Sequence, residues 1–263
     1  MLPDTTGQVV VRPKRAHPDK VAGRALTSLT SGLLAPVCRL RYMGTQNLPK
    51  SGGFIAVSNH ASELDGITFT EYLFDNGYKP HVFAKQVLFR VPVVGLMFRD
   101  SGMIPVSRGS DKAANSLDIA EKLLREGKCV GIFPEGTLTR DPDLWPMEGK
   151  TGVARLALAT RVPVIPIGQW GATNILGRYS RVLKAFPRKT VTLKAGPPVD
   201  LSEFYDKPIT AELLRAATSK IMDAVTNIVG ELRGETPPVR RFDLHLHPEY
   251  KKKQQTYPPL VRP

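Results

Sequence analysis

Residues 54–65 read Phe-Ile-Ala-Val-Ser-Asn-His-Ala-Ser-Glu-Leu-Asp, and this stretch decides the fold class. The four apolar residues at 54–57 follow a Ser-Gly-Gly turn and indicate a short strand buried on both faces. The polar run after them ends at Asp65, where the pattern of a helix begins. A buried strand that passes through a short turn into a helix is typical of a parallel α/β sheet.

The same alternation continues along the chain. Further short β-rich runs lie at 82–84, 103–106, 130–133, 164–167 and 191–195. Helical patterns with one apolar face cover 110–126, 149–160 and 210–232. Because strands alternate with helices, we expect an α/β domain with a mostly parallel central sheet flanked by helices.

The two ends of the chain differ in composition from this domain. In residues 21–37 apolar side chains recur every three to four positions, which predicts an N-terminal amphipathic helix. Basic flanks favour a helix resting on anionic lipid, and packing against its own domain fits the pattern equally well. We therefore expect a basic arm and membrane-surface helix over 1–43, the main domain over 44–233, and a disordered, basic, proline-rich tail over 234–263.

Charge and cysteine content limit the classes of partner. The 263 residues include 37 Lys and Arg against 24 Asp and Glu, a formal net charge of +13. This excess indicates an anionic partner such as phosphate, an anionic membrane surface or nucleic acid. Cys38 and Cys129 are too few for a disulfide framework or a zinc site of their own, which fits a reduced cytoplasmic compartment. No apolar run approaches the roughly 20 residues of a membrane-spanning helix, which favours peripheral attachment.

His60 and Asp65 are the first candidates for chemistry. Histidine accepts a proton near pH 7, and a nearby aspartate fixes its tautomer and stabilises the imidazolium. His60 follows a buried strand, and Asp65 comes five residues later at the start of a helix. A second interpretation stays open, because Ser62 and Asp65 also fit a helix capping box that needs no catalysis.

Two further segments place polar residues at the carboxyl ends of predicted strands, where open α/β sheets bind ligands. In Phe133-Pro-Glu-Gly-Thr137, Glu135 is suited to accept hydrogen bonds from substrate hydroxyls, and Gly136 allows close approach to the backbone. The strand near 103–106 delivers Arg108, whose guanidinium suits a phosphate. Lys85, after the run at 82–84, adds a second positive charge.

Together and in this order, the segments resemble the glycerolipid acyltransferase family, the PlsC-like acylglycerolphosphate acyltransferases. The family's Asn-His-x4-Asp motif matches Asn59, His60 and Asp65. Its arginine-containing motif matches 102–108, its Phe-Pro-Glu-Gly-Thr motif matches 133–137, and its Val-Pro-Val-x-Pro motif matches 162–166. The resemblance covers roughly residues 40–200.

The resemblance implies an enzyme of phospholipid biosynthesis, peripheral on the cytoplasmic face of the membrane. It would transfer a fatty acyl group from acyl-CoA or acyl-carrier protein to a hydroxyl of a glycerophosphate-type acceptor, lysophosphatidate or glycerol 3-phosphate. His60 would be the general base with Asp65 as its partner. Lys85 and Arg108 would grip the acceptor phosphate, and Glu135, Gly136 and Thr137 would shape the acceptor site. A thioester already carries a good leaving group, so we expect no metal and no cofactor.

One departure and one alternative accompany this resemblance. The family commonly has Arg-Ser after the Gly-Thr pair, whereas here Leu138 follows and Arg140 comes later, which leaves the role of Arg140 open. The alternative is a nucleic-acid-binding protein without enzymatic activity, because residues 177–194 hold six basic residues and no acidic one. No nucleic-acid motif accompanies that block, so we expect no nucleic-acid partner. A Gly-x-Ser-x-Gly elbow is also absent, which argues against a serine hydrolase.

Overall fold

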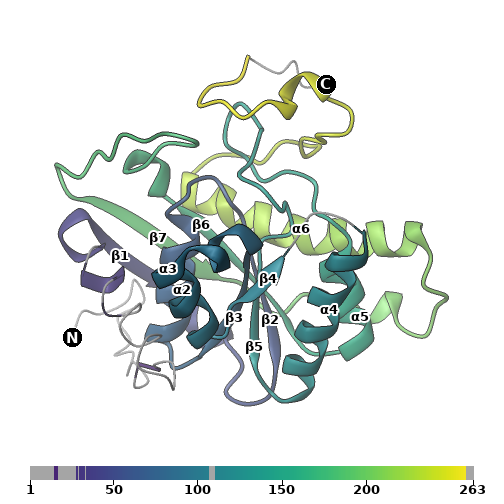
Figure 1. Cartoon of the computed structure of the whole chain (residues 1–263). Helices are drawn as coiled ribbons and strands as arrows, with labels where there is room; N and C mark the ends of the chain where they lie inside the picture. The colour runs from purple at the N-terminus through teal and green to yellow at the C-terminus, as the bar shows by residue number, and fades with distance from the viewer. Residues whose placement is uncertain (1–14, 17–27, 29, 33, 107–109, 259–263) are drawn as a thin grey trace.

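A single mixed sheet organises the chain (Figure 1). The structure is a computed structural model that describes residues 15–16, 28, 30–32, 34–106 and 110–258. In this part of the chain seven strands are hydrogen-bonded in the order β1-β7-β6-β2-β5-β3-β4. They are β1 (Cys38–Met43), β2 (Phe54–Ser58), β3 (Pro80–Lys85), β4 (Ile104–Val106), β5 (Cys129–Ile132), β6 (Val164–Trp170) and β7 (Lys189–Ala195). Neighbouring strands are parallel apart from β6 and β7, which confirms the predicted mostly parallel sheet.

Five α-helices flank the sheet within the described ranges. They are α2 (Asp65–Asp75), α3 (Pro92–Asp100), α4 (Ser110–Arg125), α5 (Gly152–Thr160) and α6 (Ala211–Arg233). Short 3₁₀ turns are η1 (Thr45–Asn47), η2 (Gln86–Arg90), η3 (Ala172–Asn174), η4 (Ser202–Phe204) and η5 (Pro248–Lys251). The predicted helices over 110–126, 149–160 and 210–232 correspond to α4, α5 and α6. Thr210 caps α6 by accepting a hydrogen bond from the backbone N–H of Leu213, as a threonine at an N-cap does.

Strand β2 shows why its sequence is apolar without interruption. Alternate side chains of a strand point to opposite faces of the sheet. Ile55 and Val57 belong to a core cluster shared with α4, α5 and α6. Phe54 and Ala56 belong to a second cluster, which includes side chains of α2. Both faces of β2 are therefore covered by helices, and the two layers can be followed in Figure 1.

Strand β1 is the element that the sequence analysis assigned differently. Residues 38–43 fell within the predicted membrane-surface arm, but Cys38–Met43 pairs in parallel with β7 at one edge of the sheet. Its burial alternates from Cys38 to Tyr42: Arg39 and Arg41 are exposed, while Leu40 packs against the second core cluster. A single short edge strand with arginines at alternate positions gives a weak apolar pattern, and the sheet begins earlier than the predicted boundary at residue 44.

The described part of the predicted N-terminal helix packs against the domain. Residues 28, 30–32 and 34–37 are helical, and Leu34 is buried in the second core cluster. The Ser31 hydroxyl donates to Glu71 of α2 at 2.7 Å, and the Arg15 guanidinium pairs with the same carboxylate at 2.6 Å. Residues 17–27, 29 and 33 lie outside the described residues, and most of the predicted lipid-facing helix is among them. In the part that is described, no helix combines the length and the apolarity needed to cross a membrane.

The tail also has a defined path. Residues 240–257, which we call the C-terminal strap, lie against the long loop between β5 and α5, at the top of Figure 1. Phe242, Tyr250 and Tyr257 of the strap are buried in a cluster with Met147 of the loop. Composition favoured disorder over 234–263, yet three buried aromatic rings anchor this segment, and the tail beyond residue 258 lies outside the described residues.

The carboxyl ends of five strands meet at one edge of the sheet. Strands β6, β2, β5, β3 and β4 all run in the same direction, so the residues that follow each of them gather there. His60 follows β2, the loop with Glu135 follows β5, and Lys85 ends β3. This edge, called the carboxyl edge below, is where the described residues His60, Glu135 and Lys85 lie.

Candidate active site

His60 and Asp65 face each other at the carboxyl edge. His60 lies in the turn after β2, and Asp65 is the first residue of α2. The His60 Nδ1 atom is 3.5 Å from Asp65 Oδ2, and the two side chains are 21% and 3% exposed. Nδ1 is buried and has no hydrogen-bond partner at this distance, so a small shift of the ring would complete the bond. The pairing assigns Nδ1 to the carboxylate and leaves Nε2 as the nitrogen that can accept a substrate proton.

Asp65 has a second task in the same turn. Its Oδ2 atom accepts hydrogen bonds from the backbone N–H groups of Ala61, at 2.5 Å, and Ser62, at 2.6 Å. The Ser62 hydroxyl donates to the carbonyl of Leu176 at 2.6 Å, so only half of a reciprocal capping box forms. The helix-capping and catalytic interpretations are therefore compatible, because one carboxylate oxygen holds the turn and faces the histidine.

Glu135 connects the second motif to the first. The side chain is 3% exposed, its Oε1 accepts the backbone N–H of His60 at 2.8 Å, and its Oε2 accepts that of Met147 at 3.1 Å. Burial raises the pKa of Glu135 to about 8, the two backbone hydrogen bonds act in the opposite direction, and the charges of Asp65 and Asp141 add to the rise. We expected Glu135 to accept from substrate hydroxyls, but backbone amides occupy both oxygens. Glu135 therefore holds the main chain of His60, and its contact with a substrate hydroxyl stays a prediction.

The loop after β5 holds His60 at two further points. The His60 ring stacks on Phe133, with ring centroids 4.4 Å apart and an interplanar angle of 28°. The His60 carbonyl accepts the backbone N–H of Thr139 at 2.7 Å. Both main-chain groups and one face of the ring are thus held by the loop that carries the Phe-Pro-Glu-Gly-Thr motif.

Gln169 is a site-supporting residue that sequence reasoning missed. It lies at the end of β6, is buried, and its Nε2 donates to Ser58 Oγ at 3.1 Å and to the Asn59 carbonyl at 3.2 Å. Its Oε1 accepts from the Thr68 hydroxyl at 2.8 Å. The Asn59 side chain in turn pairs with the Gln169 backbone, donating at 3.0 Å and accepting at 2.9 Å. The available signal was a glutamine directly after a run of buried apolar residues, two positions beyond the predicted strand end.

Gly136 and Thr137 continue the second motif at the surface. Gly136 has a φ of +67°, which favours glycine, and a Cβ atom there would lie 3.0 Å from the Lys150 side chain. The Thr137 hydroxyl is 3.1 Å from the hydroxyl of Tyr179. Gly136 is exposed, which agrees with the open backbone expected from sequence.

The two predicted phosphate-binding residues belong to neighbouring strands. Lys85 is the exposed last residue of β3 and is in register with Val106, the last residue of β4. Arg108 follows two positions later and lies outside the described residues. The strand that leads to Arg108 therefore ends beside Lys85 at the carboxyl edge.

Arg140 is turned into the fold. Its guanidinium donates to the hydroxyl of Tyr179 at 3.3 Å, to the carbonyl of Tyr250 at 2.5 Å and to the carbonyl of Lys251. Leu138, at the position where the family commonly has arginine, is also buried. Neither of these two positions therefore presents an arginine at the surface.

The basic block at 177–194 is largely committed to internal contacts. Arg178 donates to backbone carbonyls of the loop after β5, and Arg188 donates to the carbonyl of Cys38. Lys189 donates to two nearby carbonyls, and Lys194 pairs with Glu231. Four of the six basic residues that favoured a nucleic-acid-binding protein therefore have partners within the fold.

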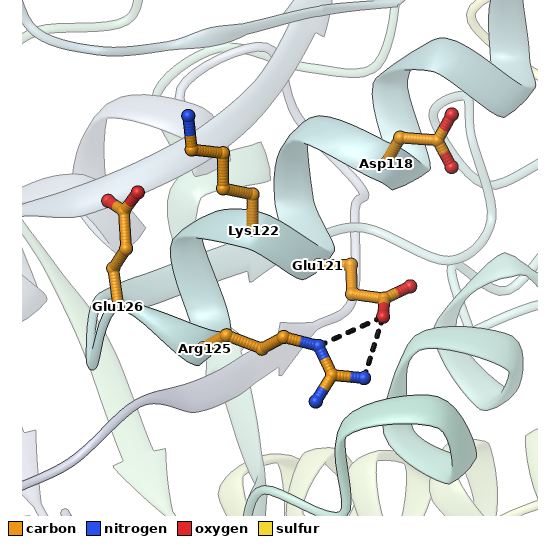
Figure 2. A pocket seen from close by; sticks show the side chains of 5 residues that line it. All are labelled: Asp118, Glu121, Lys122, Arg125 and Glu126. Atoms are coloured by element: carbon orange, nitrogen blue, oxygen red, sulfur yellow. Dashed lines mark hydrogen bonds and ion pairs between the residues drawn. The ribbon is translucent and has the colours of Figure 1, made fainter.

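A surface hollow of about 480 Å³ lies along the last turns of α4 (Figure 2). It is lined by Asp118, Glu121, Lys122, Arg125 and Glu126. Figure 2 shows Glu121 and Arg125 joined to each other, at 2.7 and 3.0 Å. Helix α4 leads directly into the start of β5, so this hollow lies towards the amino edge of the sheet, opposite His60. Across the described ranges, no three His, Cys, Asp or Glu side chains gather into a metal-binding group.

A mostly parallel sheet, with His60 in the turn after β2, Asp65 at the start of α2 and a glutamate loop after β5, defines an acyltransferase-type domain. The model of the Acyltransferase family matches residues 39–170, and the chain belongs to this family. The resemblance inferred from the motifs is thereby confirmed.

Individual proteins that are similar to this chain in sequence or structure carry more specific names. A 1-acyl-sn-glycerol-3-phosphate acyltransferase of Borreliella burgdorferi is 33% identical over 132 residues, which cover 50% of this chain and 51% of that protein. The enzyme of the same name from Bacillus subtilis is 27% identical over 187 residues, 71% of this chain and 86% of that one. The crystal structure of the 1-acyl-sn-glycerophosphate acyltransferase PlsC from Thermotoga maritima superposes with a TM-score of 0.62, at 25% identity, over 81% of this chain and 80% of that chain.

Proposed function

We propose that this protein transfers a fatty acyl group from an acyl thioester to the hydroxyl of lysophosphatidate. The observation that carries the proposal is the His60–Asp65 pair, with Nδ1 and Oδ2 at 3.5 Å, at the carboxyl edge of the sheet. The printed names of the Borreliella and Bacillus relatives support lysophosphatidate as the acceptor. Glycerol 3-phosphate is the alternative acceptor, since it offers the same hydroxyl and phosphate chemistry.

The reaction needs one base and no enzyme nucleophile. His60 Nε2 takes the proton of the acceptor hydroxyl while that oxygen attacks the thioester carbonyl carbon. The C–O bond forms, the C–S bond breaks, and the proton on His60 passes to the departing thiolate. Asp65 stabilises the imidazolium between these two steps, which is the role of the carboxylate in Ser-His-Asp hydrolases. A positioned base of this kind contributes about 10²–10⁴-fold to the rate.

Lys85 and Arg108 are proposed to bind the acceptor phosphate. Lys85 is exposed at the end of β3, and the register of β3 with β4 brings the chain leading to Arg108 alongside it. A guanidinium binds phosphate through two parallel hydrogen bonds, and an ammonium adds a point charge. Acyl-CoA and acyl-carrier protein both carry phosphate, so either donor suits a chain of net charge +13.

A peripheral position on the anionic cytoplasmic face of a membrane is the second part of the proposal. The segment after β3 exposes Val87, Val93 and Leu96, with 61%, 64% and 50% of their surfaces accessible. Residues 85–99, which include η2 and most of α3, contain three basic residues and no acidic residue. Exposed apolar side chains between cations match the surface of an anionic bilayer. The segment begins at Lys85, so a docked bilayer would present lysophosphatidate beside its binding residues.

An acceptor panel tests the acyl transfer. Purified protein is incubated with labelled acyl-CoA or acyl-carrier protein and with lysophosphatidate, glycerol 3-phosphate or a monoacylglycerol, and the product regioisomer is identified. We expect acylation of the phosphate-bearing lipid and little of the monoacylglycerol, with His60→Ala as the inactive control. Thioester cleavage that proceeds equally without any acceptor would identify a thioesterase instead. If the monoacylglycerol were acylated as fast as lysophosphatidate, the proposed recognition of the acceptor phosphate would be contradicted.

A further inference from the structure

Arg140 and Arg178 are buried guanidinium groups that the proposed reaction does not use. They are 5% and 4% exposed. Each reaches the C-terminal strap, residues 240–257, through backbone carbonyl groups. Arg140 donates to the carbonyls of Tyr250 and Lys251, and Arg178 donates to the carbonyl of Gln255 at 3.2 and 3.3 Å. Backbone carbonyl groups of the strap thus take the place of water around these two buried charges.

Arg178 also holds the loop that touches His60. Its Nη1 atom donates to the carbonyls of Thr139, at 3.0 Å, and Asp141, at 2.6 Å. The backbone N–H of Thr139 donates to the carbonyl of His60 at 2.7 Å. The Arg178 guanidinium therefore links the strap directly to Thr139, the residue that binds the main chain of His60.

A second connection runs through Met147. Its side chain packs in the cluster formed with Phe242 and Tyr250, and the backbone N–H of Glu148 donates to the Phe242 carbonyl at 2.9 Å. The Met147 backbone N–H donates to Glu135, whose other carboxylate oxygen accepts the N–H of His60. Both main-chain groups of His60 are therefore bound by a loop that the strap covers.

Aromatic contacts fix the strap itself. The rings of Tyr250 and Tyr257 stack with centroids 5.3 Å apart, and the Arg178 guanidinium lies 4.5 Å from the centre of the Tyr257 ring. The Tyr257 hydroxyl donates to the carbonyl of Lys252 at 2.8 Å. Removing these rings would release the strap without substituting any residue that contacts His60.

We propose that the C-terminal strap positions His60 for catalysis. Docking of the strap on Arg140, Arg178 and Met147 fixes the loop after β5 and thereby sets the separation between His60 and Asp65. That separation is 3.5 Å, just beyond hydrogen-bond length, so a sub-ångström displacement of His60 decides whether Nδ1 bonds to the carboxylate. The kinetic part of this inference rests on the proposed acyl transfer, and the structural part does not.

The test combines kinetics with amide exchange at His60. In the double variant Tyr250→Ala with Tyr257→Ala, we expect kcat to fall roughly 10–100-fold, the cost of a misplaced catalytic group. The acceptor KM should change less than about twofold, because no substrate contact is altered. Hydrogen exchange at the His60 amide should become faster. Tyr78→Ala is the matched control, since this ring packs on Phe54 near the amino edge of the sheet and its loss should lower Tm without changing kcat.

Two outcomes would overturn the inference. One is a folded double variant with wild-type kcat and unchanged exchange at His60. The other comes from the full-length wild type: limited trypsin digestion within the exposed run Lys251–Lys253 nicks the strap after folding, and activity that survives complete nicking contradicts the positioning role. Activity lost in step with nicking supports it, even if the double variant does not fold. If the wild type acylates no acceptor, the proposed function fails, while exchange at His60 still decides whether the strap holds the histidine.

Discussion

The carboxylate of Glu135 accepts the backbone N–H of His60 at 2.8 Å, across 75 positions of sequence. A side chain from the loop after β5 thus holds the proposed base in the turn after β2. Its other oxygen accepts the backbone N–H of Met147 at 3.1 Å, so the carboxylate joins two loops. Because both oxygens are used, the shape of this turn depends on an acidic side chain that need not touch the substrate.

Glu135→Gln should change how stability depends on pH. The carboxyl of an unfolded glutamate titrates near pH 4.3, and burial raises the pKa of Glu135 to about 8 in the folded protein. Between these values the folded state binds more protons, so Glu135 makes the unfolding free energy fall as pH rises, and the loss is complete above about pH 8. The variant lacks this dependence, which is on the order of 1 kcal/mol per pH unit. Urea denaturation at several pH values measures it.

The exposed Glu63→Gln is the control for this experiment, because it makes the same chemical change three residues from His60. Parallel pH profiles for wild type and Glu135→Gln would contradict the raised pKa. The same variant should also lower kcat above about pH 8, where Glu135 is ionised, since a carboxamide offers only one oxygen to the two N–H groups.

His60→Ala and Asp65→Asn should separate base chemistry from turn stability. We expect His60→Ala to reduce kcat about 10²–10⁴-fold with little change in Tm. Asp65→Asn should reduce kcat and also lower stability by about 0.5–2 kcal/mol, because Asp65 accepts the N–H groups of Ala61 and Ser62. The double variant should be no slower than His60→Ala, since the two residues act as one unit. Strictly multiplicative losses of kcat would argue against a shared role.

Gln169→Leu should destabilise the protein more than a typical surface change. The substitution removes the hydrogen bonds that the Gln169 side chain makes with Ser58, the Asn59 carbonyl and Thr68, and we expect a loss on the order of 1–3 kcal/mol. Thermal melting and urea denaturation give the value directly. An unfolding free energy within about 0.5 kcal/mol of wild type would show that this network is dispensable.

Lys85→Met should raise the KM for the acceptor and leave the KM for the donor nearly unchanged. Arg108→Lys should act in the same direction, because it keeps the charge and loses the bidentate geometry. We expect roughly a tenfold change, the size of about 1.4 kcal/mol of lost binding. Lys128→Met, an exposed lysine next to the start of β5, is the control. Equal rises in both KM values would reject a specific contact with the acceptor phosphate.

Val87→Glu and Val93→Glu should weaken binding to anionic vesicles. Each variant places a negative charge on the exposed apolar surface of η2 and α3. Anionic lipids would repel this charge, and its burial in the bilayer surface would cost free energy. Ile119→Glu on α4, 44% exposed in the wild type, is the matched control and should bind as the wild type does. Sedimentation with anionic and neutral vesicles at low and high salt provides the measurement. Identical vesicle binding by all three variants would remove this surface from the proposed membrane contact.

The sequence by itself determined the mostly parallel sheet, the position of α4, α5 and α6, and the turn that joins His60 to Asp65. These features are local: apolar periodicity sets each element, and His60 in the turn after the strand lies only five residues before Asp65 at the helix start. Because the strands run parallel, Lys85 and the loop with Glu135 lie at the same edge of the sheet.

Only the tertiary structure decided what Glu135, Gln169 and Arg140 do. Their partners are 75, 110 and 110 residues away, at His60, Asn59 and Tyr250. The type of a polar residue shows which hydrogen bonds its side chain can make, but not which groups are its partners. Glu135 was therefore as suited to accept from a substrate hydroxyl as from backbone N–H groups. Composition also did not reveal the strap, because the prolines and lysines of residues 234–263 favoured disorder, while three separated aromatic rings supply the anchorage of residues 240–257. Long-range hydrogen bonds and buried rings leave no local periodicity, and only folding brings their members into contact.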